Sequence, residues 1–172
     1  PPVLVLGVAQ RLVRTLCPGG GKRSKVEGST KEMIEKEFSD LPDKFQKDLP
    51  DFKEVYRMEP TPDCPAGTQG RIACFEVFDM THELEQAILQ KKPEDELRGI
   101  VRTQGMITMK EDAIIKSARG VVPFEEVNTL GGEFELDDVP VIAPAPAPEA
   151  ISADGVSGVA DKEPAPIKEV EI

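Results

Sequence analysis

The chain has 172 residues, 39% hydrophobic and 31% charged, so it can bury one core and still present a well-solvated surface. Its formal net charge of −11 argues against nucleic acid or an anionic membrane surface as a partner, because both need clustered Lys and Arg. No apolar run approaches the roughly 18 residues of a membrane-spanning helix, so we expect no direct membrane insertion. Three cysteines, an odd number, provide no disulfide framework and favour a reducing cytoplasm.

The first segment, residues 1–17, is apolar with interspersed Arg. Its residues 1–7 read as the cut edge of a longer protein rather than a signal peptide, because they are short and have no basic leader. We expect a helix over 8–12 and then a strand over 13–16. Residues 18–25 contain a Pro-Gly-Gly-Gly run and predict a loop.

Residues 26–63 predict short helices separated by prolines. Ser29 and Glu32 have capping-box spacing, so a helix should begin at Thr30 and end before Pro42. A strand could follow over Lys53–Met58. The apolar side of the first helix would hold Met33, Ile34 and Phe38, and a weaker helical turn would hold Leu41, Phe45 and Leu49.

Residues 64–139 are the most regular part of the chain. Their β-branched and aromatic content predicts a strand over Arg71–Phe78. Amphipathic helices should follow over 81–91, 93–105, 108–120 and 123–131. Thr81 should cap the first of them, and Thr108 with Glu111 should form a capping box on the third.

From residue 140 onward, Ala and Pro alternate before the chain becomes small, polar and acidic. Such a composition buries too little apolar surface to offset the entropy of ordering. We therefore interpret residues 132–172 as a linker and a disordered tail.

Four blocks spread over residues 8–130 match known motifs in the same order. Residues 9–18 resemble AQRLVRxLCP, residues 64–77 resemble CxxCxxTGYxGRxGIYEV, residues 105–112 resemble GMxTLxxDG, and residues 116–127 resemble KALxGxTTxEEV. These are motifs of the ATPases of type II secretion and type IV pilus assembly. The chain is similar to the C-terminal portion of that family.

The resemblance implies an α/β fold that forms the C-terminal edge of a RecA-like P-loop ATPase core. Residues 1–17 would end the core, with its final helix and strand over 8–17, and residues 71–78 would add a core strand to make a strand hairpin. Residues 18–70 would be an inserted loop with degenerate zinc knuckles. A small all-helical C-terminal domain would occupy 79–131, before the acidic tail.

The resemblance also implies a function. Family members form cytoplasmic homo-hexamers that are peripheral at the inner membrane through their partners. They couple ATP hydrolysis, with Mg²⁺, to movement of an inner-membrane platform protein that extrudes pilin subunits. Protein secretion, pilus assembly and DNA import share these motifs, so the motifs do not distinguish them.

The chain itself lacks a phosphate-binding loop. Gly21-Lys22 is the nearest candidate for G-x-x-x-x-G-K-[ST], but Leu16 occupies the first Gly position and Arg23 the Ser/Thr position. The family's Walker A and Walker B motifs would lie upstream of residue 1. We therefore expect this chain alone to be inactive as an ATPase.

Two cysteines occupy positions that bind a structural zinc in many family members, where two C-x-x-C pairs supply four thiolates. Cys17 and Cys64 keep the first position of each pair, whereas Gly20 and Gly67 occupy the second. Two thiolates leave a zinc half-coordinated, so we expect zinc binding to be lost. The alternatives are a weak two-cysteine site, or a disulfide under oxidation if the two segments are adjacent. Cys74 should pack within a strand.

Two arginines are candidates for contacts with nucleotide or at a subunit boundary, because the resemblance sets Arg11 and Arg71 near the edge of the core. The alternative is a structural ion pair, for example with Glu76. Asp112 and the Glu125-Glu126 pair lie in first turns of predicted helices, where carboxylates favour the helix N-terminus.

The sequence also allows a second function. The chain could be a non-catalytic interaction module, such as a split or degenerate ATPase subunit that acts through its helical domain and acidic tail. An upstream reading frame that continues into a phosphate-binding loop would distinguish the motor from the scaffold.

Overall fold

A computed structural model describes residues 4–130, so the predicted linker and tail lie outside the described residues, as do Gly131 and Gly132. The structure is mixed α/β, with two small sheets and several helices. In chain order the elements are β1 (Leu6–Leu16), β2 (Lys22–Lys25), α1 (Gly28–Glu37), α2 (Asp43–Gln46), β3 (Glu54–Arg57), β4 (Thr68–Asp79), α3 (His82–Leu89), α4 (Glu94–Thr103), α5 (Met109–Ala118) and the 3₁₀ helix η1 (Phe124–Leu130).

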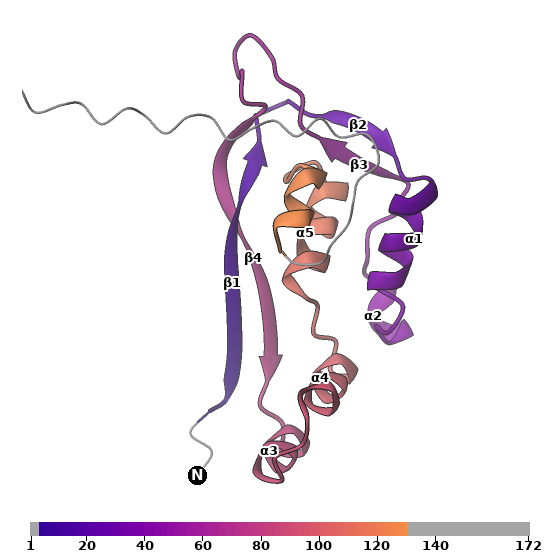
Figure 1. Ribbon diagram of the computed structural model, residues 1–172, viewed down its shortest axis with the longest axis vertical. Coiled ribbons are helices and arrows are strands. Elements are labelled where there is room, and N and C mark those ends of the chain that lie inside the picture. The colour runs from indigo at the N-terminus through magenta and orange to yellow at the C-terminus, as the bar shows by residue number, and fades with distance from the viewer. Residues whose placement is uncertain (1–3, 131–172) are drawn as a thin grey trace, which may run out of the picture. The chain divides into compact units, whose positions relative to one another are not determined.

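The two long strands β1 and β4 form an antiparallel ribbon (Figure 1). Their register runs from Leu6 opposite Asp79 to Leu16 opposite Thr68, with one irregularity between Arg14 and Leu16. The predicted strand over 71–78 is confirmed. The helix predicted over 8–12 is wrong, because these residues all pair with β4 and this pairing satisfies their backbone groups as a strand.

The ribbon has one packed face and one open face, since side chains alternate along a strand and directly opposed residues share a face. Val13 and Cys74 are buried on the packed face, beside α5. The other face carries exposed apolar side chains, and Leu12 is 56% exposed. We call the following set the open face: Leu6, Val8, Leu12, Phe75 and Val77.

The insertion between β1 and β4 is more structured than its sequence suggests. Residues 18–25 are not wholly a loop, because Lys22–Lys25 forms β2 and pairs antiparallel with β3. The strand predicted over 53–58 is confirmed as β3. Helix α1 begins at Gly28 with Glu27 as its N-cap and no side-chain cap, so the capping box predicted at Ser29 does not form.

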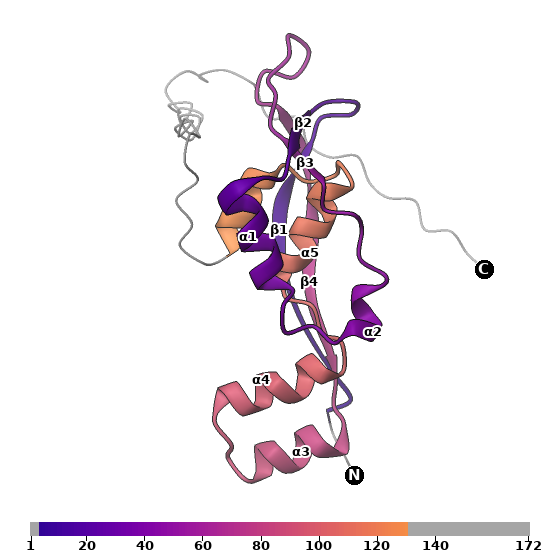
Figure 2. The same ribbon diagram turned by 90° about the vertical axis from the view of Figure 1, so that its right-hand side faces the viewer.

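Helices α3, α4 and α5 follow the ribbon as predicted. The Thr81 hydroxyl accepts a hydrogen bond from the Leu84 amide at the start of α3. Thr108 and Glu111 form a complete capping box at the start of α5. Gly105 and Gly120 follow α4 and α5 with φ of +94° and +73°, a backbone region that glycine enters without strain. Figure 2 shows α3 and α4 side by side.

One hydrophobic core joins the insertion, the ribbon and the last helices. Ile114 of α5 and Phe124 of η1 have no exposed surface, and they belong to the same cluster as Ile34 of α1, Val55 of β3 and Val13 of β1. The insertion is thus held to the ribbon by apolar packing through α5. No helix among residues 4–130 is long and apolar enough to cross a membrane.

Candidate functional site

The two remnant knuckle cysteines lie together. Cys17 and Cys64 form a disulfide with a Cα–Cα distance of 6.6 Å. The interpretation that three cysteines provide no disulfide framework is therefore wrong, and the alternative of a disulfide between adjacent segments is what the structure contains. The bond forms because the pairing of Leu16 with Thr68 brings the two ends of the insertion to the same end of the ribbon.

The residues around this bond do not fit a zinc ion. A closed structural zinc site needs four ligands, and both thiolates are consumed by the disulfide. Within residues 4–130, no group of three or more His, Cys, Asp or Glu side chains is arranged to hold a metal. His82, the one histidine of the chain, lies beside Glu85 on α3, away from both cysteines in sequence.

The candidate phosphate loop does not fit a nucleotide either. A phosphate cradle needs a helix N-terminus directly after the glycine-rich turn. Gly21-Lys22 instead leads into β2, where Lys22 lies opposite Arg57. Gly21-Lys22 therefore does not form a phosphate-binding loop, and we assign no step of ATP chemistry to it.

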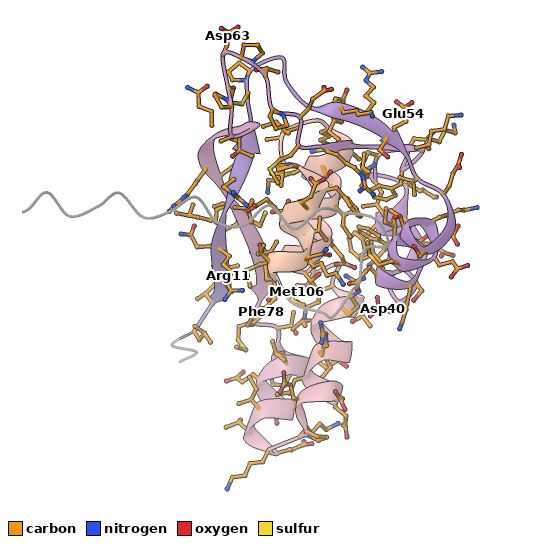
Figure 3. All side chains as sticks on the ribbon, turned by 45° about the horizontal axis from the view of Figure 1, so that its top comes forward. Arg11, Asp40, Glu54, Asp63, Phe78 and Met106 are labelled. Carbon is orange, nitrogen blue, oxygen red and sulfur yellow. A yellow bond between two sulfur atoms is a disulfide. The ribbon has the colours of Figure 1, made fainter. Side chains whose placement is uncertain are left out.

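The two candidate arginines lie on opposite faces of the ribbon. Arg11 lies opposite Cys74, on the face toward α5, and its Nη1 donates to the carbonyl of Thr129 at 3.2 Å (Figure 3 labels Arg11). Arg71 lies opposite Arg14, on the same face as Leu12. The two guanidinium groups therefore do not form one site.

Arg71 remains without a counter-ion among residues 4–130. The Arg14 guanidinium turns to Glu126, with Nε 2.7 Å from Oε1, whereas the Arg71 side chain is exposed and has no ion pair there. The suggested ion pair with Glu76 does not form, because Glu76 lies on the packed face of the ribbon, opposite to the face of Arg71, and its Oε1 accepts there from the Met109 amide at 3.1 Å. Two cations opposite one another repel, so Arg14 and Arg71 do not stabilise each other across the ribbon.

Three carboxylates have a role that the sequence did not reveal, since each accepts a hydrogen bond from a backbone amide in a strand or directly after one. Glu126 Oε2 accepts from Arg14 N at 3.0 Å, Asp112 Oδ2 from Phe75 N at 2.9 Å, and Glu125 Oε2 from Met58 N at 3.1 Å. Their places in first helical turns suggested helix-terminus roles alone. Pairing these amides with carboxylates fastens α5 and η1 to the strands.

A buried charge cluster around Arg102 was also missed. Its guanidinium, on α4, is almost fully buried and donates to Glu111 of α5, to Asp40 after α1 and to two backbone carbonyls. Burial lowers the pKa of Arg102, but its hydrogen bonds to Glu111 and Asp40 outweigh burial and raise that pKa overall. This cluster joins three helices, and only the capping-box pattern of Glu111 signalled part of it.

A large open groove of about 1,100 Å³ lies between the insertion's helices and its small sheet. Its floor includes Phe38 and Phe52, whose rings stack at 5.0 Å. Arg23 lies over the Tyr56 ring at 5.5 Å. The charges at its rim are mixed in sign, so the groove has no single-sign field to select a nucleotide or an anionic ligand.

This geometry defines the class of protein only broadly, as a mixed α/β chain with a hairpin, a disulfide-closed insertion and trailing helices. Comparison with protein families is more specific. The family model described as Type II/IV secretion system protein matches residues 3–129. The chain belongs to this family.

Several curated relatives agree with the family model. The chain is 35% identical over 120 residues to a Type II secretion system protein E from Xanthomonas campestris, a match that covers 70% of this chain and 20% of the relative. It is 26% identical over 123 residues to a Type IV pilus assembly ATPase PilB from Pseudomonas aeruginosa, covering 72% and 20%. The chain thus spans about a fifth of the length of the curated relatives it matches.

Proposed function

We propose that this chain is the C-terminal portion of a hexameric motor ATPase that powers type IV pilus assembly or type II protein secretion. In this proposal the chain completes a RecA-like core with its ribbon, and residues 79–131 form the helical C-terminal domain. ATP and Mg²⁺ bind to the preceding part of the ATPase. The motor works in the cytoplasm, peripheral at the inner membrane, and acts on a membrane platform protein.

The open face of the ribbon carries the proposal. Its five apolar side chains are each at least 41% exposed, and they lie on one face of a two-stranded ribbon. A two-stranded ribbon is rarely stable alone, and a clustered apolar face on it marks a surface that another layer covers. Burying the exposed half of each side chain would contribute about 1 kcal/mol. Family membership and the length of the relatives support our assignment of that layer to the rest of the ATPase core.

Within this proposal, Arg71 contacts the boundary of the nucleotide site or a carboxylate of a neighbouring subunit, because its guanidinium is exposed beside the open face and lacks a counter-ion among the described residues. Arg11 makes its proposed contact, with nucleotide or at a subunit boundary, from the packed face of the ribbon. Replacing Arg71 with Ala in the complete ATPase should lower kcat/KM, whereas Arg98→Ala on the exposed surface of α4 should not. Equal activity of the two variants would remove Arg71 from the site.

Association with the preceding core tests the proposal directly. The 172-residue chain is co-expressed with the upstream part of the ATPase, and complex formation is measured for Leu12→Glu, Val77→Glu and the control Leu89→Glu. Leu89 is an exposed apolar residue on α3, outside the open face. We expect the two open-face variants to lose the complex and its ATPase activity, while the control keeps both.

All three variants should change the stability of the isolated chain by no more than about 1 kcal/mol, because the replaced side chains are exposed. Equal binding by open-face and control variants would contradict the proposal. The gene sequence offers a second check. A reading frame that continues upstream into G-x-x-x-x-G-K-[ST] supports the motor, and a start codon within a few residues would instead favour the non-catalytic scaffold.

A further inference from the structure

The Cys17–Cys64 disulfide lies where the insertion joins the ribbon. Cys17 directly follows β1, and Cys64 lies four residues before β4 begins at Thr68. Leu16 and Thr68 are the last paired residues at this end of the ribbon. The bond therefore joins the points where the chain leaves the ribbon and returns to it, across 47 residues of sequence.

Residues 59–67, which we call the finger, are closed by their own backbone hydrogen bonds. Thr61 N donates to Cys64 O at 3.1 Å and Cys64 N donates to Thr61 O at 3.0 Å. Gly67 N donates to Cys64 O at 2.9 Å. Figure 3 shows Asp63 at the tip of the finger. These bonds are all internal to this short turn, so the disulfide is what fastens the finger to the end of β1 and keeps the turn in place.

The core of the insertion, unlike the finger, does not depend on the disulfide. Ile34, Phe38 and Val55 belong to the same buried cluster as Ile114 of α5, and none of them lies in the finger. Opening the bond should therefore leave the packed core in place. Its effect is confined to the attachment of the finger at the end of β1.

The third cysteine cannot compete for this bond. Cys74 has no exposed surface, and burial raises the pKa of its thiol to about 11. The thiolate is the form that exchanges with disulfides, and a buried neutral thiol is inert. Cys64, by contrast, is partly exposed. The fold thus leaves one exchangeable pair.

We propose that the Cys17–Cys64 bond is a redox-sensitive link between the finger and the end of β1. A small thiol such as glutathione opens the bond and releases the finger, and oxidised glutathione closes the bond again. A glutathione thiolate attacks Sγ of Cys64 to form a mixed disulfide, and Cys17 leaves as a thiolate that takes a proton from water. A second glutathione thiolate attacks the glutathione sulfur of the mixed disulfide. Cys64 leaves as a thiolate, and oxidised glutathione is released, so two electrons pass to the protein.

The reducing cytoplasm makes this bond a reversible switch rather than a permanent structural cross-link. Cytoplasmic thiols keep most cysteines reduced, and disulfides that form there are usually transient or sensory. This step uses the cytoplasmic location of the proposed function. The chemistry is tested on the purified chain, so its failure would not bear on the motor assignment.

The first experiment measures the bond itself. The 172-residue chain is equilibrated in glutathione buffers from fully oxidised to fully reduced, then alkylated and analysed by peptide mass spectrometry. We expect Cys17 and Cys64 to pass together from unlabelled to labelled, with Cys74 labelled only after denaturation. A pair that stays closed in millimolar reduced glutathione, never closes in oxidised glutathione, or exchanges with Cys74 would overturn the proposal.

The second experiment measures the release of the finger by amide hydrogen exchange. Reduction should cause loss of protection in residues 59–67 and leave α5 protected. The double variant Cys17→Ser/Cys64→Ser should show the amide exchange of reduced wild type at every glutathione ratio. The exchange of Cys74→Ala should change with the glutathione ratio as that of wild type does. Unchanged exchange in the finger on reduction of the wild-type chain would refute its release, whatever the variants do.

Discussion

Replacing Arg102 with Met should destabilise the chain by about 3–5 kcal/mol, the range for removing one partner of a buried ion pair. Met keeps much of the length and volume of the side chain, so the change removes mainly the charge and its hydrogen bonds. The Glu111 side chain is 1% exposed and would remain buried without its counter-ion. Asp40 also loses a partner, but its side chain is 64% exposed, and such a pair is worth at most about 1 kcal/mol.

These magnitudes assign the loss to Glu111 rather than to Asp40, and two further variants test that assignment. Asp40→Asn alone should cost less than about 1 kcal/mol. The double variant Arg102→Met/Glu111→Gln removes the stranded charge and keeps a side chain that can accept from the Thr108 amide, as Glu111 does at 2.7 Å. It should therefore be more stable than Arg102→Met by at least about 1 kcal/mol.

Urea unfolding of the 172-residue chain, followed by far-ultraviolet circular dichroism, measures these differences at a common slope. A loss of less than about 1 kcal/mol in Arg102→Met, or a double variant no more stable than the single one, would contradict the assignment of the loss to Glu111. A loss of equal size in Asp40→Asn would likewise show that the exposed pair, not the buried one, holds the three helices together.

Further predictions concern glycine, a buried thiol and metal content. Gly99→Ala should stabilise the chain by about 0.5–1 kcal/mol, because Gly99 lies inside α4 with open space around it. Gly105→Ala should instead destabilise it by more than about 1 kcal/mol, because φ is +94° and the new Cβ would lie 2.5 Å from Cζ of Phe45; thermal melts of both variants check the opposite signs. Burial raises the pKa of Cys74 from 9.0 to about 11, so the folded state keeps a proton that the unfolded state loses between these values. Wild type should therefore lose stability relative to Cys74→Ala as pH rises from 9 to 11, by at most about 1.4 kcal/mol per unit, and parallel pH profiles would contradict this. The chain purified without chelator should contain well under one equivalent of zinc by elemental analysis; a full equivalent that is lost in Cys64→Ser would show that a metal site exists.

Local sequence patterns were sufficient to predict a helix or strand where its secondary structure depends on its own residues. The capping box at Thr108 and the β-branched run that became β4 were both readable, because each depends on residues adjacent in sequence. The family was readable for a similar reason, since four ordered blocks carry it and the matching family model covers residues 3–129. The helical pattern of residues 8–12 failed because apolar residues four apart suit a helix, whereas pairing with a strand more than 50 residues away decided the outcome.

What the sequence determined by itself was the family, the order of the later helices and the absence of a phosphate-binding loop motif in this chain. Tertiary structure alone decided which distant groups meet: Cys17 with Cys64, Arg102 with Glu111 and Asp40, and backbone amides with Glu125, Glu126 and Asp112. The physical reason is that these contacts are set by the antiparallel register of β1 and β4 and by the burial of α5. Periodicity and local composition report on a segment's own backbone, and they do not encode that pairing.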